Sequence, residues 1–181
     1  MICFIISFAQ EMSVPAKLQY QIFLKILTFD RNLRERVSDE IVIGIIYQSN
    51  FRKSWKVREE IVEAINESPE KKLGDIPIRY VTINLSGEND LKEIISRNKV
   101  DILYITPIRA FDLRTITVMS RAKKILTLTG VTDYVELGIA VGLGLKRQKP
   151  QIIINLTAAK AEGSNFSSKL LNLAKIVGSE N

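Results

Sequence analysis

The sequence contains no histidine, and its one cysteine is Cys3. Histidine and cysteine supply most zinc ligands, thiol nucleophiles and acid–base triads, so their absence excludes these kinds of site from the rest of the chain. A domain without cysteine suits either a reducing or an oxidising compartment. We therefore expect a protein with no catalytic residues, no metal site and no cofactor.

The overall composition is that of an ordinary globular chain. Hydrophobic residues make up 46% and charged residues 25% of the 181 residues, which is enough for one domain with a substantial core. The net charge is +6 and the isoelectric point is near 9.4. A bias of this size suits nucleic acid, an anionic membrane surface or an acidic partner, and it does not choose between them.

The first nine residues, MICFIISFA, are apolar and uncharged, with small side chains at Ser7 and Ala9 where a signal peptidase would cut. The run is too short to span a bilayer and lacks the basic start of a complete signal peptide. We interpret residues 1–9 as a signal-peptide-like segment whose own start lies upstream, and residues 10–181 as an exported, periplasmic domain. The alternative is a buried N-terminal strand.

Runs of β-branched residues predict buried parallel strands, and the amphipathic segments between them predict helices. The expected strands are residues 41–47, 78–85, 100–106 and 125–129, and the expected helices are residues 13–36, 51–67, 90–98 and 111–124. Short connections between alternating strands and helices imply right-handed βαβ units. The predicted fold class is therefore α/β, a single three-layer domain with a mostly parallel, doubly wound sheet in the order 2-1-3-4.

The end of the chain departs from this alternation. Residues 139–145 and 151–156 are two apolar segments whose five-residue connection is too short for a crossover. They predict an antiparallel hairpin at an edge of the sheet. A terminal helix is expected over residues 167–177.

The strand before this hairpin turn has one face with almost no side chains. Gly142 and Gly144 lie on that face, and their spacing is not that of a phosphate-binding loop. A bare face lets another backbone approach closely, and Lys146 and Arg147 in the turn would attract an acidic partner. We predict that these four residues contact a partner. The alternative places the chain's own last helix against the bare face.

The first helix is apolar on two faces, of which Tyr20, Phe23, Leu24 and Leu27 form the second. We predict an interface there, either with a second copy of the chain or with a partner. Trp55 lies on the flank of the core stripe of the next helix and is expected to be half exposed. For Trp55 we weigh core packing, a protein contact and single-stranded nucleic acid, and we expect no nucleic-acid partner.

In a doubly wound sheet the ligand crevice lies beyond the carboxyl ends of the central strands. In this sequence the crevice collects Ser49 and Asn50 after the first strand with Thr106 and Arg109 after the third. These groups could hold an anionic ligand or could simply cap the loops. No paired carboxylates or general base accompany them, so the pattern does not indicate catalysis.

The C-terminal segment resembles the closing signature of the YfiR family. Residues 153–160 (IINLTAAK) are followed by Gly163 and by residues 167–174 (SSKLLNLA), and a weaker likeness extends back to the aromatic first helix. The resemblance implies a periplasmic α/β protein that restrains a membrane-anchored diguanylate cyclase by binding its periplasmic domain, and that is itself relieved by an outer-membrane lipoprotein. The chain departs from the better-known members because it carries no disulfide after Cys3 and has Phe29-Asp30 where an aromatic residue and proline usually close the first helix.

Three hypotheses follow from these patterns. By resemblance, the chain is a non-enzymatic periplasmic regulator that controls cyclic-di-GMP indirectly, with a homodimer as a further expectation. The alternative is a periplasmic small-ligand receptor, since a lone doubly wound lobe resembles half of a binding protein. A third hypothesis is a cytoplasmic nucleotide-binding domain, which would require residues 1–9 to be a retained strand.

Overall fold

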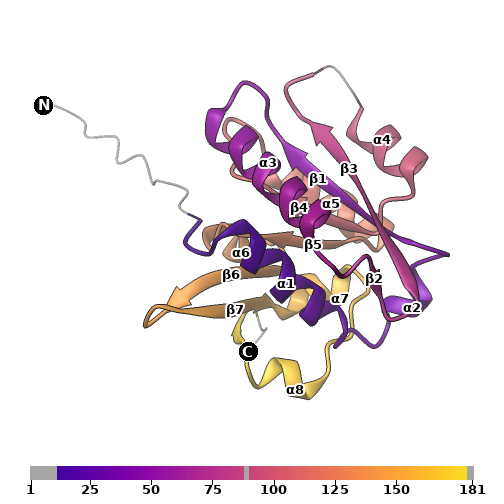
Figure 1. The fold of residues 1–181 in the computed structure, drawn as a ribbon, viewed down its shortest axis with the longest axis vertical. Helices are drawn as coiled ribbons and strands as arrows, with labels where there is room; N and C mark the ends of the chain where they lie inside the picture. Colours follow the sequence, from indigo (N-terminus) through magenta and orange to yellow (C-terminus); the bar gives the residue numbers. More distant parts are fainter. Residues whose placement is uncertain (1–11, 88–89, 179–181) are drawn as a thin grey trace, which may run out of the picture.

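A mostly parallel β-sheet forms the middle layer of the molecule (Figure 1). The computed structural model describes residues 12–87 and 90–178, so the signal-peptide-like segment lies outside the described residues. The four expected strands are β1 (Ile41–Tyr47), β3 (Ile76–Asn84), β4 (Ile102–Ile105) and β5 (Leu126–Thr129). β1 pairs in parallel with β3 on one side and with β4 on the other, and β4 pairs in parallel with β5. The order 2-1-3-4 predicted from the sequence is confirmed.

Helices cover both faces of this sheet. α1 (Ala16–Leu27) and α3 (Arg52–Glu67) pack on one face, and α4 (Leu91–Asn98), α5 (Leu113–Lys123) and α6 (Asp133–Glu136) pack on the other. Successive side chains of a strand point to opposite faces. In β1, Ile43 and Ile45 therefore join the core beneath α1 and α3, while Val42 and Ile46 join the core beneath α4 and α5. The three-layer α/β prediction is confirmed.

The C-terminal part of the chain extends the sheet beyond β5. β6 (Val141–Lys146) runs parallel to β5, and β7 (Lys149–Asn155) returns antiparallel to β6, so the predicted hairpin is confirmed. The hairpin does not form the edge of the sheet, because β8 (Lys175–Val177) pairs in parallel with β7. The eight strands have the order β2-β3-β1-β4-β5-β6-β7-β8, in which β2 (Lys72–Leu73) is a short antiparallel strand at the other edge.

Two helices differ from the sequence prediction. The last helix, expected over residues 167–177, is a single turn, α8 (Ser168–Leu171), and the chain then enters β8. Ile176 and Val177 are β-branched, and the edge of β7 offers them backbone hydrogen bonds. The first helix, expected over residues 13–36, ends at Leu27, and a turn separates it from α2 (Leu33–Arg36). α7 (Leu156–Ala161) follows β7 and was not predicted.

Candidate functional site

The carboxyl ends of β1, β3 and β4 bring the crevice loops to one end of the sheet. Gln48, directly after β1, donates through its side-chain amide to the carbonyl oxygen of Arg109 (2.8 Å), and its amide oxygen accepts from the Arg109 N–H (2.7 Å). Asn84, the last residue of β3, accepts from the Ser49 N–H (3.1 Å) and donates to Ser49 Oγ (3.0 Å). Side-chain amides therefore hold the three loops to one another.

Much of the polar character of the crevice is used inside the protein. Thr106 is fully buried, and its Oγ1 lies 2.6 Å from Ser54 Oγ of α3. Its expected place on the crevice surface is thus wrong, because the side chain points beneath α3. Asn50 Oδ1 accepts from Ser86 Oγ (2.7 Å). Among the four predicted crevice residues, Ser49, Asn50 and Arg109 are exposed, and any ligand contact by them stays a prediction.

Aromatic and arginine side chains stack beside the crevice. The Arg109 Cζ atom lies 4.2 Å from the centroid of the Phe51 ring, just before α3. Further along α3, the Arg58 Cζ atom lies 4.7 Å from the Tyr47 ring centroid and 5.7 Å from that of Trp55. The side chain of Trp55 is 45% exposed, so the half-exposed position predicted from the helical stripe is confirmed. We call Tyr47, Phe51, Trp55, Arg58 and Arg109 the aromatic cluster.

The residue types of the aromatic cluster are those typical of a protein–protein interface. Cation–π contacts at exposed sites contribute about 0.5–1 kcal/mol each and limit the conformations of both side chains. Arg58 is further restrained by an ion pair with Glu59. Trp, Tyr and Arg dominate the energetics of many protein interfaces. Side chains that are ordered before binding lose less entropy on binding, so this surface is suited to recognition.

The apolar face of α1 on which an interface was predicted is not available to a partner, so that prediction is wrong. Tyr20, Phe23, Leu24 and Leu27 are between 1% and 6% exposed and belong to the core. Phe23 packs edge-on against Tyr104 of β4, with the ring centroids 6.0 Å apart. Burial raises the pKa of Tyr20 to about 12. Both faces are apolar because α1 contacts the sheet and α3 at once.

The bare face of β6 is also covered by the chain itself. A Cβ atom on Gly142 would clash with Val135 Cγ2 of α6, and one on Gly144 would lie 2.7 Å from Thr132 Cγ2. The partner contact predicted at these glycines is therefore wrong. The alternative of close packing within the chain is correct, with α6 in place of the last helix. Glycine is needed here for close approach of two elements.

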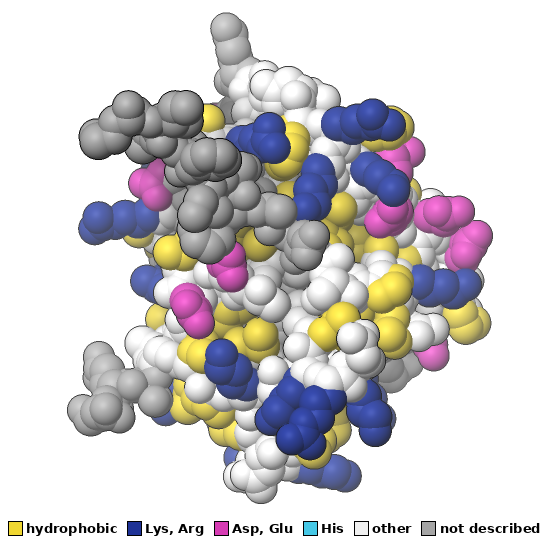
Figure 2. Space-filling model, turned by 90° about the vertical axis from the view of Figure 1, so that its left-hand side faces the viewer, with side chains coloured by type: hydrophobic (Ala, Val, Ile, Leu, Met, Phe, Trp, Pro, Cys, Tyr) yellow, Lys and Arg dark blue, Asp and Glu magenta, His cyan; other side chains and the backbone are white. Residues whose placement is uncertain are grey.

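The turn of the β6–β7 hairpin is exposed and basic. Arg147 and Gln148 have positive φ angles of 50° and 64°, as a tight two-residue hairpin turn requires. Lys146, Arg147 and Lys149 are all exposed. Figure 2, which looks onto this end of the hairpin, shows a group of Lys and Arg side chains in its lower part. The attraction of an acidic partner by Lys146 and Arg147 stays a prediction.

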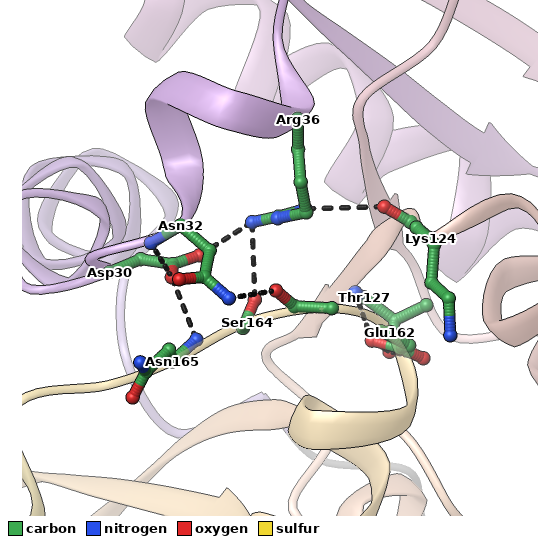
Figure 3. A network of polar contacts seen from close by, with 9 residues as sticks. Asp30, Asn32, Arg36, Lys124, Thr127, Glu162, Ser164 and Asn165 are labelled. Atoms are coloured by element: carbon green, nitrogen blue, oxygen red, sulfur yellow. Dashed lines mark hydrogen bonds and ion pairs between the residues drawn. The ribbon is translucent and has the colours of Figure 1, made fainter.

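A polar network that the sequence analysis missed joins segments from opposite ends of the chain (Figure 3). The side chain of Asp30, after α1, accepts from Arg36 Nη2 (2.5 Å) and from the Asn165 N–H (2.9 Å). Arg36 also donates to Ser164 Oγ (3.1 Å) and to the carbonyl oxygen of Lys124 (3.2 Å). The aspartate in place of the usual proline is thus a structural anchor for the closing segment. In the sequence, the sign of this network was the Phe29-Asp30 pair at the end of the first helix.

Glu162, the residue directly after α7, carries a fully buried carboxyl group. It accepts from the Thr127 N–H (2.8 Å) and from Thr127 Oγ1 (2.9 Å), and its Oε1 lies 2.8 Å from Ser120 Oγ of α5. Burial raises the pKa of Glu162 to about 7, although hydrogen bonds from Ser120 and Thr127 act in the opposite direction. No group of three or more Asp, Glu or Cys side chains that could hold a metal ion occurs in the described part of the chain. In the described part of the chain, Glu162 is therefore a buried packing residue and does not belong to a group that could bind a metal ion.

No helix within residues 12–87 and 90–178 has both the length and the apolar character needed to cross a bilayer.

Comparison with families of known sequence gives one match over most of the chain. The family model described as YfiR/HmsC-like matches residues 16–175, which run from the start of α1 into β8. Among curated proteins, none matches the sequence.

Several solved structures share the fold at low sequence identity. An ABC domain in complex with L-Trp from Streptococcus pneumonia has a TM-score of 0.60 and 15% identity over 90% of this chain. A conserved domain protein from Vibrio cholerae O1 biovar eltor has a TM-score of 0.58 and 15% identity over 91% of this chain. A substrate-binding protein with adhesive properties from Clostridium difficile, in its ligand-free, open form, has a TM-score of 0.54 and 17% identity over 86% of this chain. The chain spans 60%, 60% and 59% of the lengths of these three structures.

Proposed function

Because the chain belongs to the YfiR/HmsC-like family, we propose that it is a non-enzymatic periplasmic regulator that acts by binding another protein. The proposed partner is the periplasmic domain of a membrane-anchored diguanylate cyclase. By restraining that enzyme, the chain would control the level of cyclic-di-GMP without binding or making the nucleotide. An outer-membrane lipoprotein is the second proposed partner, and its binding would relieve the restraint.

The observation that carries this proposal is the family match together with the aromatic cluster. Trp55 is a large, half-exposed apolar side chain in a surface that arginines hold in order. Most tryptophan surface is buried in a monomeric protein, and a half-exposed tryptophan beside arginines is the composition of an interface centre. We propose that the aromatic cluster is the centre of the contact with the cyclase domain. The basic hairpin turn would contribute to the rate at which the two proteins meet.

The chemistry of the exposed groups supports a binding role. The chain has no histidine, and within the described residues Ser49 and Asn50 are hydrogen-bonded to the side-chain amide of Asn84 and the hydroxyl of Ser86. A serine hydroxyl is a weak nucleophile unless an adjacent base takes its proton. Glu162, the buried carboxyl group with a pKa near 7, is fully covered by protein. Reaction with a substrate would require the proton-accepting group to reach it.

The test is direct binding between the purified mature chain and the isolated periplasmic domains of the membrane-anchored diguanylate cyclases of the source organism. Surface plasmon resonance of each domain should give saturable binding for one of them. Trp55→Ala should weaken that binding at least about tenfold, as expected for a central interface residue. Leu137→Ala is the matched control, because Leu137 is 62% exposed and lies outside the aromatic cluster. Absence of binding to every such domain would reject the proposal.

A second candidate function is a small-ligand receptor, which two of the similar structures favour, because one is in complex with L-Trp and the other is a substrate-binding protein. In this case Ser49, Asn50 and Arg109 would contact the ligand at the crevice. Isothermal titration of the purified chain with amino acids, L-Trp among them, and with small organic anions tests this function. Saturable binding that Arg109→Ala abolishes, with no cyclase domain bound, would establish the receptor function in place of the regulator.

Export is tested separately by the mass of the mature protein. We propose that the chain is cleaved after Ala9 and recovered from the periplasmic fraction. The N-terminal peptide of the purified native protein should then begin at Gln10. If the protein is instead cytoplasmic and retains residues 1–9, the regulator proposal is rejected. The third hypothesis, an intracellular nucleotide-binding domain, then takes its place.

A further inference from the structure

The helix layer formed by α4 and α5 is basic, because these two helices together carry five basic side chains and one carboxylate. α5 carries Arg114, Arg121 and Lys123 and no carboxylate, whereas α3 carries four basic and four acidic side chains. Two ion pairs lie on α3, and within the described residues none of the ion pairs includes a cation of α4 or α5. The positive charge of this layer is therefore not neutralised by the chain's own described carboxylates in direct contact.

A groove of about 670 Å³ lies on this layer, along α5 and beside the start of α4. Its apolar lining residues are Val118, which is 58% exposed, the exposed Ala122, and Met119, which is 4% exposed and packs mainly in the core. Lys92, Arg114 and Lys123 supply its cations, and Asp112 and Thr115 complete the lining. We call these eight residues the α4–α5 groove.

The cations of the groove have few partners of their own. Lys123 Nζ donates to Ser96 Oγ (2.8 Å), which spans from α5 to α4. Asp112 is used to cap α5, since its Oδ1 accepts from the Arg114 N–H (2.9 Å). The side chains of Lys92 and Arg114 are exposed. An occupant of the groove would thus meet the apolar side chains of Val118 and Ala122, with three cations and the carboxylate of Asp112 around them.

We propose that the α4–α5 groove binds an acidic, amphipathic helix of the partner protein. A strip of apolar side chains bordered by cations is complementary to a helix with one apolar face flanked by carboxylates. α5 has 11 residues, and at 1.5 Å per residue it is about 16 Å long, which matches about three turns of a bound helix. This proposal rests on the proposed function, because the helix is assigned to the protein that the chain regulates.

The shape and composition of the groove favour a helix over other anionic ligands. A bilayer is engaged by several large apolar side chains that protrude together, whereas in this lining Val118 is exposed and Met119 is 4% exposed. Single-stranded nucleic acid is bound by stacking of bases on aromatic side chains, and the groove lining contains none. The aromatic cluster lies beside the crevice at the ends of β1 and β4 and supplies no residue to this groove.

The test uses the full mature chain and a designed peptide probe of about 16 residues, with a leucine and alanine stripe at helical spacing flanked by glutamates. The control peptide has lysine in place of each glutamate. Fluorescence anisotropy should show saturable binding of the acidic peptide and none of the basic one. Val118→Glu should weaken binding at least about tenfold, and Lys92→Glu combined with Lys123→Glu should do so mainly at low salt.

Leu137→Glu and Lys169→Glu are the matched controls, because both sites are exposed and lie outside the groove. Unfolding curves of all variants should be alike, since each change is at the surface. Equal binding of the acidic and basic peptides, or unchanged binding by Val118→Glu, would overturn the proposal. Binding to phosphatidylglycerol vesicles that Val118→Glu abolishes, without peptide binding, would overturn it in favour of a membrane surface.

The failure of this proposal is separable from failure of the proposed function. If a cyclase domain binds and Val118→Glu leaves its affinity unchanged, the groove proposal is rejected and the regulatory function stands. If the acidic peptide binds in the groove but no cyclase domain binds, helix recognition is supported and the regulatory function is rejected.

Discussion

The buried carboxyl group of Glu162 should make the stability of the protein depend on pH in one direction. Ser120 Oγ lies within hydrogen-bond distance of both Thr117 O (3.0 Å) and Glu162 Oε1 (2.8 Å). A hydroxyl has one proton, so when Ser120 donates to the carbonyl of Thr117, a protonated Glu162 can donate to Ser120 in turn. The neutral carboxyl group can therefore form hydrogen bonds to the groups around it. Ionisation instead leaves an unpaired negative charge at a fully buried position, which is unfavourable.

The size of the effect follows from the pKa. Burial raises the pKa of Glu162 from 4.5 to about 7 in the folded protein, while the unfolded chain keeps the ordinary value. Between these two values the folded state binds more protons than the unfolded state, so stability falls as pH rises. Below pH 4.5 the group is neutral in both states and has no effect. Above pH 7 the full cost applies, on the order of 3 kcal/mol, since each pKa unit corresponds to about 1.4 kcal/mol.

Glu162→Gln removes this dependence while keeping the size of the side chain. Relative to the native protein, the variant should gain about 3 kcal/mol of unfolding free energy between pH 4 and pH 8. In thermal unfolding this corresponds to a relative gain in Tm of roughly 6–12 °C for a domain of this size. Glu63→Gln, at an exposed position of α3, is the control and should show no such trend. A difference between native protein and Glu162→Gln that stays constant from pH 4 to pH 8 would refute the assignment.

Other predictions concern packing and charge. Gly142→Leu should lower the unfolding free energy by about 1–3 kcal/mol in urea titrations because the new side chain overlaps α6; a folded fraction that binds the partner poorly would restore the glycine face as an interface. Tyr20→Glu should abolish the cooperative unfolding transition seen by circular dichroism, since a charge would enter the core; a folded but less associated variant would return α1 to the surface. Lys146→Glu with Arg147→Glu should slow association mainly at low ionic strength in stopped-flow measurements, and an equal effect at high salt would argue against electrostatic steering.

The central sheet could be predicted because its signals are local. The continuous run of apolar, largely β-branched residues in Ile41–Tyr47 has no amphipathic alternation, which is typical of a strand covered on both faces. The last strand could not be predicted in the same way. Leu170, Leu173 and Ala174 have helical spacing, and a segment as short as Lys175–Val177 becomes a strand only because β7 lies beside it.

The surfaces were harder to predict, because what covers an apolar or bare face is decided by distant parts of the chain. The sequence showed that Gly142 has a bare face, and only the packing of Val135 against it shows that the face is closed. The hydrogen bond from Asn165 to Asp30 joins residues 135 positions apart. Trp55 was placed correctly at a half-exposed position because the helical stripe beside it is a local pattern.

The measurement that tests the regulatory role most directly is the cellular content of cyclic-di-GMP. Deletion of the gene should raise the cyclic-di-GMP level, and the exported native chain should return it to normal. Trp55→Ala should fail to restore the level although it is exported and folded, whereas Leu137→Ala should restore it. A cyclic-di-GMP level that deletion leaves unchanged, under conditions in which both the chain and its proposed cyclase are produced, would contradict the account.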